Sequence, residues 1–414
     1  MTQPLAPPPR KNPARRTPVP TLPPGTRSRA ALGLSLAAAQ GRFQLQTCTD
    51  CGAVQYPPRD ACHRCLSTAL AWQDQPRGAQ LLAETTIHAS PDPYFRERLP
   101  WRAGTVQLDA GPVALAHIHG DVLRGARTRM ALMLDRAGQG VLVALPEKET
   151  PHMQDDPALR AMGTHPRHRR ILIADARAPE APALTRALLD AGAAHVFLGL
   201  SERWRPFPAQ PTLAAMENVT LHPLDVTDAE SITDLAGSIG GKVDILINNA
   251  RHIRPGGVIT GTIHDAGDAL EKGALGLMRL AHAFGPALAA RGADGVNSAA
   301  AWVTVLPAQA LAHDPAFAAS TAAGAATRAL SLSLRAELRA GGIRVLHVHA
   351  GPVDDEWHQP LPPPKLAPKA LARAIVQGLE QGLEEVHAGD VARDIAERFA
   401  RNPALLAREM EGGA

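Results

Sequence analysis

The chain has few of the residues on which redox and aromatic chemistry depend. Cysteine occurs four times and tyrosine twice in 414 residues, and the aromatic residues make up 3% of the sequence. No apolar run approaches the roughly 20 residues of a membrane-spanning helix. Residues 1–28 also lack the apolar core of a secretory signal. We therefore expect a cytoplasmic protein with no membrane partner.

Charge is close to balanced, with a formal net charge of +3, and no acidic residue occurs before Asp50. The first 28 residues are rich in proline and arginine and cannot bury apolar surface, which predicts a disordered, partly polyproline arm over residues 1–28. A transit-peptide or nucleic-acid role of this arm is the alternative, but no aromatic residue is interleaved with its charges. The remaining length is sufficient for two or three domains.

The four cysteines form two pairs, Cys48-x2-Cys51 and Cys62-x2-Cys65. Four thiolates in this spacing can converge tetrahedrally on a soft divalent ion, which predicts zinc, with rubredoxin-type iron as the alternative because its ligand set is the same. A redox dithiol needs only one pair, in a βαβ setting that is missing here. Because every ligand is a thiolate, no coordination position stays open, and the metal is expected to be structural. We expect His63 to be solvated rather than to bind the metal.

Residues 29–70 should contain a short helix and this cysteine-rich segment. In residues 71–146, apolar and polar residues alternate as they do in short strands. Five short strands predict a small closed barrel such as an OB fold. OB folds often bind nucleic acid, but that use requires exposed stacking aromatics on a basic face, and aromatic residues are few here. We therefore do not expect nucleic acid as a partner. The predicted strands are Ala79–Ala89, Gly104–Leu108, Val113–His119, Arg127–Leu134 and Gly140–Leu145.

The segment from Phe43 to Cys65 reads Phe-Gln-Leu-Gln-Thr-Cys, then Cys51-Gly52, Gln55-Tyr-Pro-Pro-Arg and the second cysteine pair. This run resembles the rubredoxin-like zinc ribbon of the OB-fold acyl-CoA-associated family. The predicted barrel is similar to the second part of that family, so the resemblance covers residues 30–147. Members are generally small accessory subunits of thiolase-type enzymes that act on acyl-CoA thioesters. The resemblance therefore implies a thiolase-like partner and acyl-CoA rather than a catalytic centre in this chain.

Residues 147–170 are polar and aperiodic, which predicts an interdomain linker. From Ile171 short apolar strands alternate with helices, which predicts a Rossmann-like doubly wound parallel sheet over residues 171–414. The predicted strands are Ile171–Ala174, His195–Leu200, Val219–Leu221, Val243–Ile247, Trp302–Leu306 and Ile343–Val348. The predicted helices include Pro182–Ala191, Asp228–Gly237, Asp268–Ala290 and Ala316–Arg339.

This second part is similar to the short-chain dehydrogenase/reductase superfamily. The motifs that carry the resemblance are Leu-Asp225-Val226-Thr-Asp, Asp-Ile-Leu-Ile-Asn248-Asn249-Ala250, Ser-Leu-Arg-Ala-Glu-Leu338 and Ala350-Gly-Pro-Val. That superfamily holds the pyrophosphate of NAD(P) over a glycine-rich turn after the first strand, because the backbone must approach the phosphates closely. No glycine occurs between Ile171 and Ala191, and two carboxylates, Asp175 and Glu180, lie in the turn. Arg177 compensates only in part, so the binding of NAD(P) is doubtful.

The superfamily's catalytic residues are missing as well. Its members use a Tyr-x3-Lys pair, an earlier serine that polarises the carbonyl and often an asparagine, and the lysine lowers the pKa of the tyrosine. The corresponding positions here are Phe317, Thr321, a residue within Thr304 to Pro307, and Gly273. The only tyrosines of the chain, Tyr56 and Tyr94, lie in its other half. The sequence therefore predicts no catalytic residue in this domain.

Part of the cofactor-binding pattern survives. The candidate cofactor contacts are Asp225, Val226, Asn248 and Ala250. We favour a structural role for them at strand ends, with residual nucleotide or CoA binding as the alternative. Arg251 stands where the superfamily has glycine, and we expect His347 and His349 to be satisfied core or loop residues.

The sequence thus favours a non-catalytic accessory subunit of a thiolase-like enzyme, in which the reductase-like domain serves assembly. Its two long helices, at residues 268–290 and 316–339, could pair as they often do in that superfamily, giving a homodimer or a complex with an active reductase. One alternative is an NAD(P)-dependent oxidoreductase with an atypical proton donor, for which His313 and Asp314 are candidates. A nucleic-acid-binding OB-fold protein is the further alternative.

Overall fold

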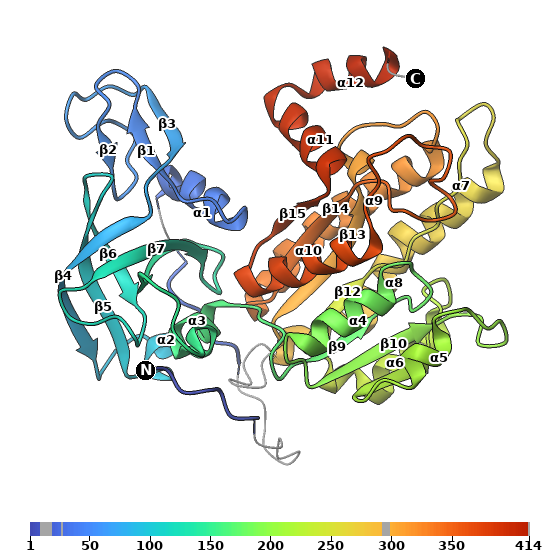
Figure 1. The fold of residues 1–414 in the computed structure, drawn as a ribbon, viewed down its shortest axis with the longest axis horizontal. Helices are drawn as coiled ribbons and strands as arrows, with labels where there is room; N and C mark the ends of the chain where they lie inside the picture. The colour runs from blue at the N-terminus through green and yellow to red at the C-terminus, as the bar shows by residue number, and fades with distance from the viewer. Residues whose placement is uncertain (9–18, 26–27, 292–298, 413–414) are drawn as a thin grey trace. The chain divides into compact units, whose positions relative to one another are not determined.

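The computed structural model covers residues 1–414 and describes all of them except 9–18, 26–27, 292–298 and 413–414. The chain divides into two compact units (Figure 1). The first consists mainly of residues 21–165 and the second mainly of residues 166–414. Among the described residues, no helix is both long and apolar enough to cross a membrane.

The first unit begins with a short helix and a three-stranded antiparallel sheet. A 3-10 turn, Arg29–Ala31, leads into α1 (Leu32–Ala39), in agreement with the predicted helix. The strands β1 (Gln44–Cys48), β2 (Val54–Gln55) and β3 (Leu70–Asp74) are ordered β2-β1-β3. Cys48 ends β1, and the other three cysteines lie on the connections between the strands. This is the zinc-ribbon part of the chain.

Five strands then close a barrel in the order β4-β5-β6-β8-β7, which confirms the predicted OB fold. Alternate residues of each strand point inward, as Met130 and Leu132 of β7 do. Phe43 and Leu45 belong to the same hydrophobic cluster as the barrel residue Leu81, so the ribbon and the barrel share a core. The strands are β4 (Gly78–Ile87), β5 (Trp101–Leu108), β6 (Val113–Ile118), β7 (Arg127–Leu134) and β8 (Gly140–Pro146), with α2 (Pro93–Arg96) between β4 and β5.

The predicted linker is structured over much of its length. A 3-10 turn, Met153–Asp155, and α3 (Pro157–Met162) follow the barrel. The carboxylate of Asp156 caps α3 by accepting from the backbone N–H of Ala158 at 2.9 Å, and Met162 is buried in one hydrophobic cluster with Trp101. A capping aspartate followed by proline is a helix-start signal that the polar composition of the segment obscured.

The described parts of the N-terminal arm contact the first unit. The backbone N–H of Leu5 donates to Asp155 Oδ2 at 3.1 Å, and Thr21 Oγ1 donates to Glu97 Oε2 at 2.6 Å. The prediction of a disordered arm over residues 1–28 stays a prediction, and residues 9–18 and 26–27 lie outside the described residues.

The second unit is a seven-stranded sheet in the order β11-β10-β9-β12-β13-β14-β15, with every neighbouring pair parallel. This confirms the doubly wound fold (Figure 1). The strands are β9 (Arg170–Ile173), β10 (His195–Leu200), β11 (Val219–Pro223), β12 (Ile245–Asn248), β13 (Ala301–Pro307), β14 (Arg344–Ala350) and β15 (Glu385–Ala388).

Helices cover both faces of this sheet. Residues of α6, α8 and α9 share one hydrophobic cluster with Trp302 of β13 and Val345 of β14, whereas Gly378 of α10 packs against Leu346 and Val386 on the other face. The helices are α4 (Ala181–Asp190), α5 (Gln210–Ala214), α6 (Ala229–Ile239), α7 (Ile263–Leu270), α8 (Gly276–Arg291), α9 (Ala318–Leu338), α10 (Pro368–Gln381), α11 (Asp390–Arg401) and α12 (Pro403–Gly412).

The helix predicted over residues 268–290 is interrupted. A π turn, Glu271–Leu275, joins α7 to α8, and Gly273 lies within it. A Cβ at Gly273 would stand 3.0 Å from Thr327 Oγ1 of α9. The glycine therefore permits a close approach of the two helices at the place where the superfamily often has a catalytic asparagine.

Candidate functional site

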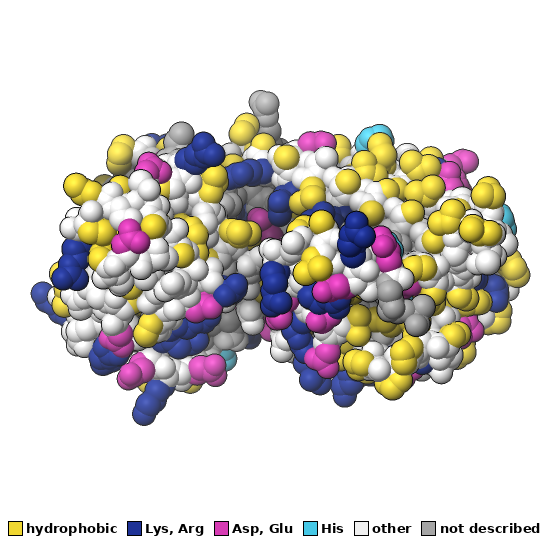
Figure 2. Space-filling view, turned by 90° about the horizontal axis from the view of Figure 1, so that it is seen from above, with side chains coloured by type: hydrophobic (Ala, Val, Ile, Leu, Met, Phe, Trp, Pro, Cys, Tyr) yellow, Lys and Arg dark blue, Asp and Glu magenta, His cyan; other side chains and the backbone are white. Residues whose placement is uncertain are grey.

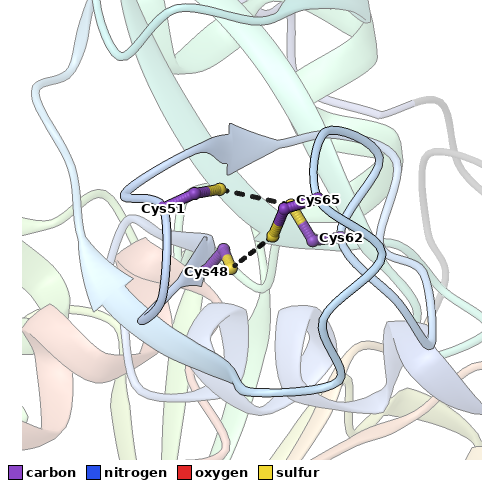
Figure 3. A group of neighbouring side chains, drawn as sticks. All are labelled: Cys48, Cys51, Cys62 and Cys65. Carbon is purple, nitrogen blue, oxygen red and sulfur yellow. Dashed lines mark hydrogen bonds between the residues drawn. The ribbon is translucent and has the colours of Figure 1, made fainter.

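The four cysteines converge on one point in the ribbon (Figure 3). The Sγ atoms of Cys48 and Cys65 are 3.6 Å apart, as are those of Cys51 and Cys62, and all four lie within 4.8 Å of one another. All four are free thiols rather than disulfides. This arrangement fits a tetrahedral metal site with four thiolate ligands, as the spacing predicts.

The backbone around each pair has the same hydrogen-bond pattern. The N–H of Gly52 donates to the carbonyl of Cys48 at 2.9 Å, and the N–H of Leu66 donates to that of Cys62 at 3.0 Å. Both donors follow their cysteine pair in the left-handed region, with φ of +70° for Gly52 and +61° for Leu66. Hydrogen bonds from the backbone of Cys65 and Arg64 lower the pKa of Cys62 to about 6, so its thiolate is the form ready to bind metal at neutral pH.

His63 is not directed at the metal site. Its side chain is exposed, and its Nδ1 lies 3.2 Å from Oε1 of Gln55, whose amide in turn bonds Gln46 Oε1 at 2.9 Å. The prediction that His63 is not a ligand agrees with this arrangement, because Gln55 already engages its ring.

The barrel contains an aromatic cavity of about 330 Å³. Tyr94 and Phe95 meet edge-to-face with ring centroids 5.3 Å apart, and Phe95 meets Trp101 in the same way at 5.4 Å. Trp101 Nε1 donates to His117 Nδ1 at 2.8 Å, which fixes the indole. Tyr94 is 2% exposed and belongs to α2 rather than to a loop, so these rings are turned inward instead of forming an exposed stacking surface for bases.

A second cavity, of about 400 Å³, lies in the reductase-like unit at the carboxyl ends of the strands, where such folds bind nucleotides. It is mainly polar and contains both signs of charge. Its charged lining residues are Asp175, Arg177, Arg251, Arg254, Lys272, Asp355 and Glu356. Trp357 also lines it, with the guanidinium of Arg254 3.5 Å above its ring.

Three backbone N–H groups in the turn after β9 are bonded within the protein. The backbone N–H of Asp175 donates to Asn249 Oδ1 at 2.9 Å, that of Ala176 to the carbonyl of Gly199 at 2.8 Å, and that of Arg177 to Asp175 Oδ1 at 2.9 Å. Burial raises the pKa of Asp175 above its usual value. The expectation that NAD(P) binding is doubtful stays a prediction, and these bonds show which N–H groups it concerns.

A buried ion pair lies next to the same turn. Arg251 holds Glu180 in a two-point contact, with Nη1–Oε1 at 2.7 Å and Nη2–Oε2 at 2.9 Å. The side chain of Glu180 is fully buried and that of Arg251 is 14% exposed. The two departures from the superfamily pattern that the sequence shows separately, the carboxylate at 180 and the arginine at 251, are therefore one interaction.

The predicted cofactor residues fall beside this cavity rather than on its lining. Asp225 Oδ1 accepts from the N–H of Thr227 at 2.9 Å, and Asn248 Oδ1 accepts from the N–H of Ala250 at 3.3 Å. Val226 and Ala250 are buried. Their contacts fit the structural role at strand ends that the sequence favours, and their neighbour Asn249 is the residue of this motif that lines the cavity.

The positions of the missing catalytic residues carry apolar or internally bonded side chains. Phe317, 5% exposed, directly precedes α9, and Thr321 is buried near the start of that helix. Thr304 is fully buried and its hydroxyl lies 3.0 Å from that of Ser331. Of the two proton donors considered from sequence, Asp314 accepts from the N–H of Ala316 at 2.9 Å and so stabilises its own loop.

The structure adds a titratable residue that sequence reasoning missed. The ring of His358 stacks on Phe317 with centroids 5.3 Å apart, and its Nδ1 lies 2.8 Å from Asp355 Oδ1. Burial raises the pKa of Asp355, but the hydrogen bonds and charge of His358 together with the backbone N–H of Trp357 outweigh it, and the net shift of this pKa is downward. No spacing in the sequence connects residue 358 to residue 317, so only the folded loop after β14 reveals this pair.

Comparisons with known proteins agree with this architecture. Residues 181–388 match the family described as enoyl-(acyl carrier protein) reductase. Residues 37–71 match the ChsH2 rubredoxin-like zinc ribbon domain, and residues 72–132 match the ChsH2 C-terminal OB-fold domain. No protein with a curated description matches the chain.

Similar solved structures are short-chain dehydrogenases. One, from Burkholderia cenocepacia J2315 in complex with NADP, is 27% identical with a TM-score of 0.53 and covers 60% of this chain and 99% of its own. Another, from Streptomyces avermitilis, is 24% identical with a TM-score of 0.50 and covers 59% of this chain and 96% of its own. The chain therefore belongs to the enoyl-(acyl carrier protein) reductase family of short-chain dehydrogenase folds, and carries the zinc ribbon and OB-fold domains of the ChsH2 type ahead of that domain.

Proposed function

We propose that this protein is an accessory subunit of a thiolase-like enzyme that acts on acyl-CoA, and that its reductase-like unit does not catalyse carbonyl reduction. The observation that carries the proposal is the state of the first turn, where three backbone N–H groups are bonded within the protein. Phe317 and Thr321 occupy the positions of the tyrosine and lysine, so a proton donor of the usual kind is missing there as well. Loss of a positioned general acid typically costs about 10²–10⁴-fold in rate.

The aromatic cavity of the barrel supports a role with acyl-CoA. Its lining is largely apolar and includes Tyr94, Phe95 and Trp101. A cavity of this kind suits the apolar part of an acyl group, since ligand sites are mostly hydrophobic with a few placed polar groups. The zinc would hold the adjoining ribbon in shape, with Cys48, Cys51, Cys62 and Cys65 as its ligands.

Co-expression of the full chain with a thiolase-like protein encoded beside it tests the proposal. We expect a stable heteromer on size-exclusion chromatography, with an interface of about 1,600 Å². Its acyl-CoA activity should fall when Cys51→Ser and Cys62→Ser disrupt the ribbon, whereas His63→Ala should leave the complex intact. If the thiolase-like protein elutes separately and is equally active alone, the proposal is wrong.

A second candidate function is supported by His358. This imidazole, paired with Asp355, stacks on the residue that replaces the catalytic tyrosine, where an oxidoreductase with an atypical proton donor would need one. The candidate predicts NAD(P)H-dependent reduction of a carbonyl substrate that His358→Ala abolishes and Phe317→Leu largely retains. Under the favoured proposal, titration with NADPH gives no binding near physiological concentration and no turnover.

A further inference from the structure

A group of three metal-ligating side chains lies outside the cysteine site, on the last two strands of the parallel sheet. β14 and β15 pair so that His349 stands opposite His387 and His347 opposite Glu385. Because side chains two residues apart share a face of a strand, all four lie on one face. His347 Nε2 lies 2.9 Å from Ser331 Oγ of α9, which identifies this face as the one that α9 covers.

Three of the four side chains point at one another. Glu385 Oε1 lies 3.5 Å from His349 Nε2 and 3.6 Å from His387 Nε2. The two imidazole rings are stacked with centroids 5.3 Å apart and planes 15° from parallel. One ligand atom from each residue lies within 4.8 Å of the other two.

The hydrogen-bonding state of the rings is unusual. His349 is fully buried, yet within the described part of the chain its Nδ1 makes no hydrogen bond, and its Nε2 and His387 Nε2 face only Glu385 Oε1, at distances longer than an ordinary hydrogen bond. We expected both His347 and His349 to have hydrogen-bond partners, and among the two only His347 does, through Ser331. Buried polar groups are rarely left without a partner, and one that is unpartnered points to an ion or water at that place.

We propose that His349, Glu385 and His387 form a second metal site, which binds a divalent transition ion such as zinc. Two imidazoles and one carboxylate are a ligand set that binds zinc and leaves a further position for water or another ligand. Glu385 is 27% and His387 22% exposed, so an ion can enter from the solvent while His349 closes the inner side. The site joins the edge strand β15 to β14.

The charges around the proposed site make the carboxylate of Glu385 important for metal binding. Arg328 of α9 contributes a positive charge that acts on His349. The ion pair of Arg335 with Glu384, at 3.2 Å, lies at the start of the same edge strand. Since Glu385 supplies the negative charge among the three ligands, we expect Glu385→Gln to weaken metal binding although it preserves the shape of the side chain.

The test uses the full chain with the cysteine-bound metal retained. After a mild chelator wash, Co²⁺ is titrated and followed by its visible spectrum and by calorimetry. We expect one further ion per chain to bind without the sulfur-to-cobalt charge-transfer band that thiolate ligands produce. His387→Ala and Glu385→Gln should each lower its affinity by more than about 100-fold, because even partners outside the ligand shell are worth 10–100-fold.

His222→Ala is the matched control, because it removes a histidine at the opposite edge of the sheet. His195 Nε2 and His222 Nε2 each lie 3.0 Å from Thr220 Oγ1, and no carboxylate joins them in any three-ligand group among the described residues. This variant should bind the second ion as the wild type does. If the wild type binds no further Co²⁺ or Zn²⁺, or if the His387→Ala variant binds it equally well, the site does not exist.

Added metal should also raise the thermal stability of the wild type, because an ion that binds only the folded state stabilises it by mass action. The same increase should be missing in the folded His387→Ala variant, as shown by thermal denaturation with and without Zn²⁺. An equal increase in both proteins would contradict the proposal, since the gain would then come from binding elsewhere.

Discussion

At the scale of single residues, Glu180 and Arg251 show how two departures from a family pattern can depend on each other. Each would be unfavourable alone, because an unpaired charge in a buried place is costly. Together they form a two-point pair whose carboxylate is fully buried. The pair also engages the base of the turn that would otherwise approach a cofactor phosphate.

We predict that Arg251→Ala lowers the free energy of unfolding by about 3–5 kcal/mol, because it leaves the carboxylate of Glu180 buried and unpaired. The double variant Glu180→Gln with Arg251→Met should recover most of this loss. Urea denaturation of the full chain measures both. Equal destabilisation by the single and the double changes would show that the lost charge pairing is not the cause.

Asp175 gives a prediction about pH. Its pKa in the folded state is raised by burial, so the folded state favours the neutral carboxyl. Its contribution to stability is therefore fully present below the unfolded pKa of about 3.9 and is lost as the pH rises through the folded value. Asp175→Asn keeps an acceptor for the N–H of Arg177 and cannot ionise. Its free energy of unfolding should exceed that of the wild type by a margin that grows with pH above about 4.

Chemical denaturation between pH 3 and 8 checks this prediction. Thr227→Ser, which lies in a turn of the same unit and changes no charge, serves as the control. Stability curves of the wild type and Asp175→Asn that stay parallel over the whole range would contradict it.

At the scale of elements, the sequence predicted those helices and strands whose residue pattern is visible within one short stretch of the chain. Alternation located β7 with the bounds Arg127–Leu134, and the strand His195–Leu200 also has the predicted bounds. α3 was missed because its capping aspartate and proline lie in a polar stretch. β15 was missed because its four residues, Glu385–Ala388, do not form an apolar run.

Whether a candidate site could be predicted also depended on how close its residues lie in the sequence. The cysteine pairs are adjacent in sequence, so their spacing alone indicates a common ion. The contacts of His358 with Phe317, and of His387 with His349, join residues about 40 positions apart and depend on the sheet order. Which N–H groups of the first turn are bonded cannot be inferred from composition, because two of the three acceptors lie far along the chain, on β10 and after β12.

For the ribbon we predict that Cys62→Ser loses the bound zinc and lowers the Tm of the first unit by at least about 5 °C. The effect should extend to the barrel, since Phe43 and Leu45 of the ribbon share its hydrophobic cluster. His63→Ala should retain both zinc and stability, because this side chain is exposed and bound to Gln55. Elemental analysis and thermal denaturation are the measurements, and freshly purified wild type without metal would overturn the assignment.

At the scale of the whole molecule, each unit has its own hydrophobic core, and each matches a different family model. On the face drawn in Figure 2, hydrophobic side chains gather over the second unit, and basic and acidic side chains are mixed rather than forming a continuous basic surface. We expect a face of this kind to suit a protein partner. The assembly expected for this unit can therefore be tested at a defined apolar surface.

One apolar surface of this unit lies on the helix that contains the π turn. Leu270, Leu275 and Met278 are 42%, 40% and 38% exposed, and the wider spacing of the π turn brings the first two toward the same side. For the homodimer expected from the sequence, we predict that Met278→Glu gives a monomer, because the change would place a charge in the proposed apolar contact. Leu123→Glu, at a 75% exposed leucine of the barrel, should leave the dimer unchanged. Sedimentation velocity at several concentrations distinguishes the two, and a dimer equally stable in Met278→Glu would exclude this surface from self-association.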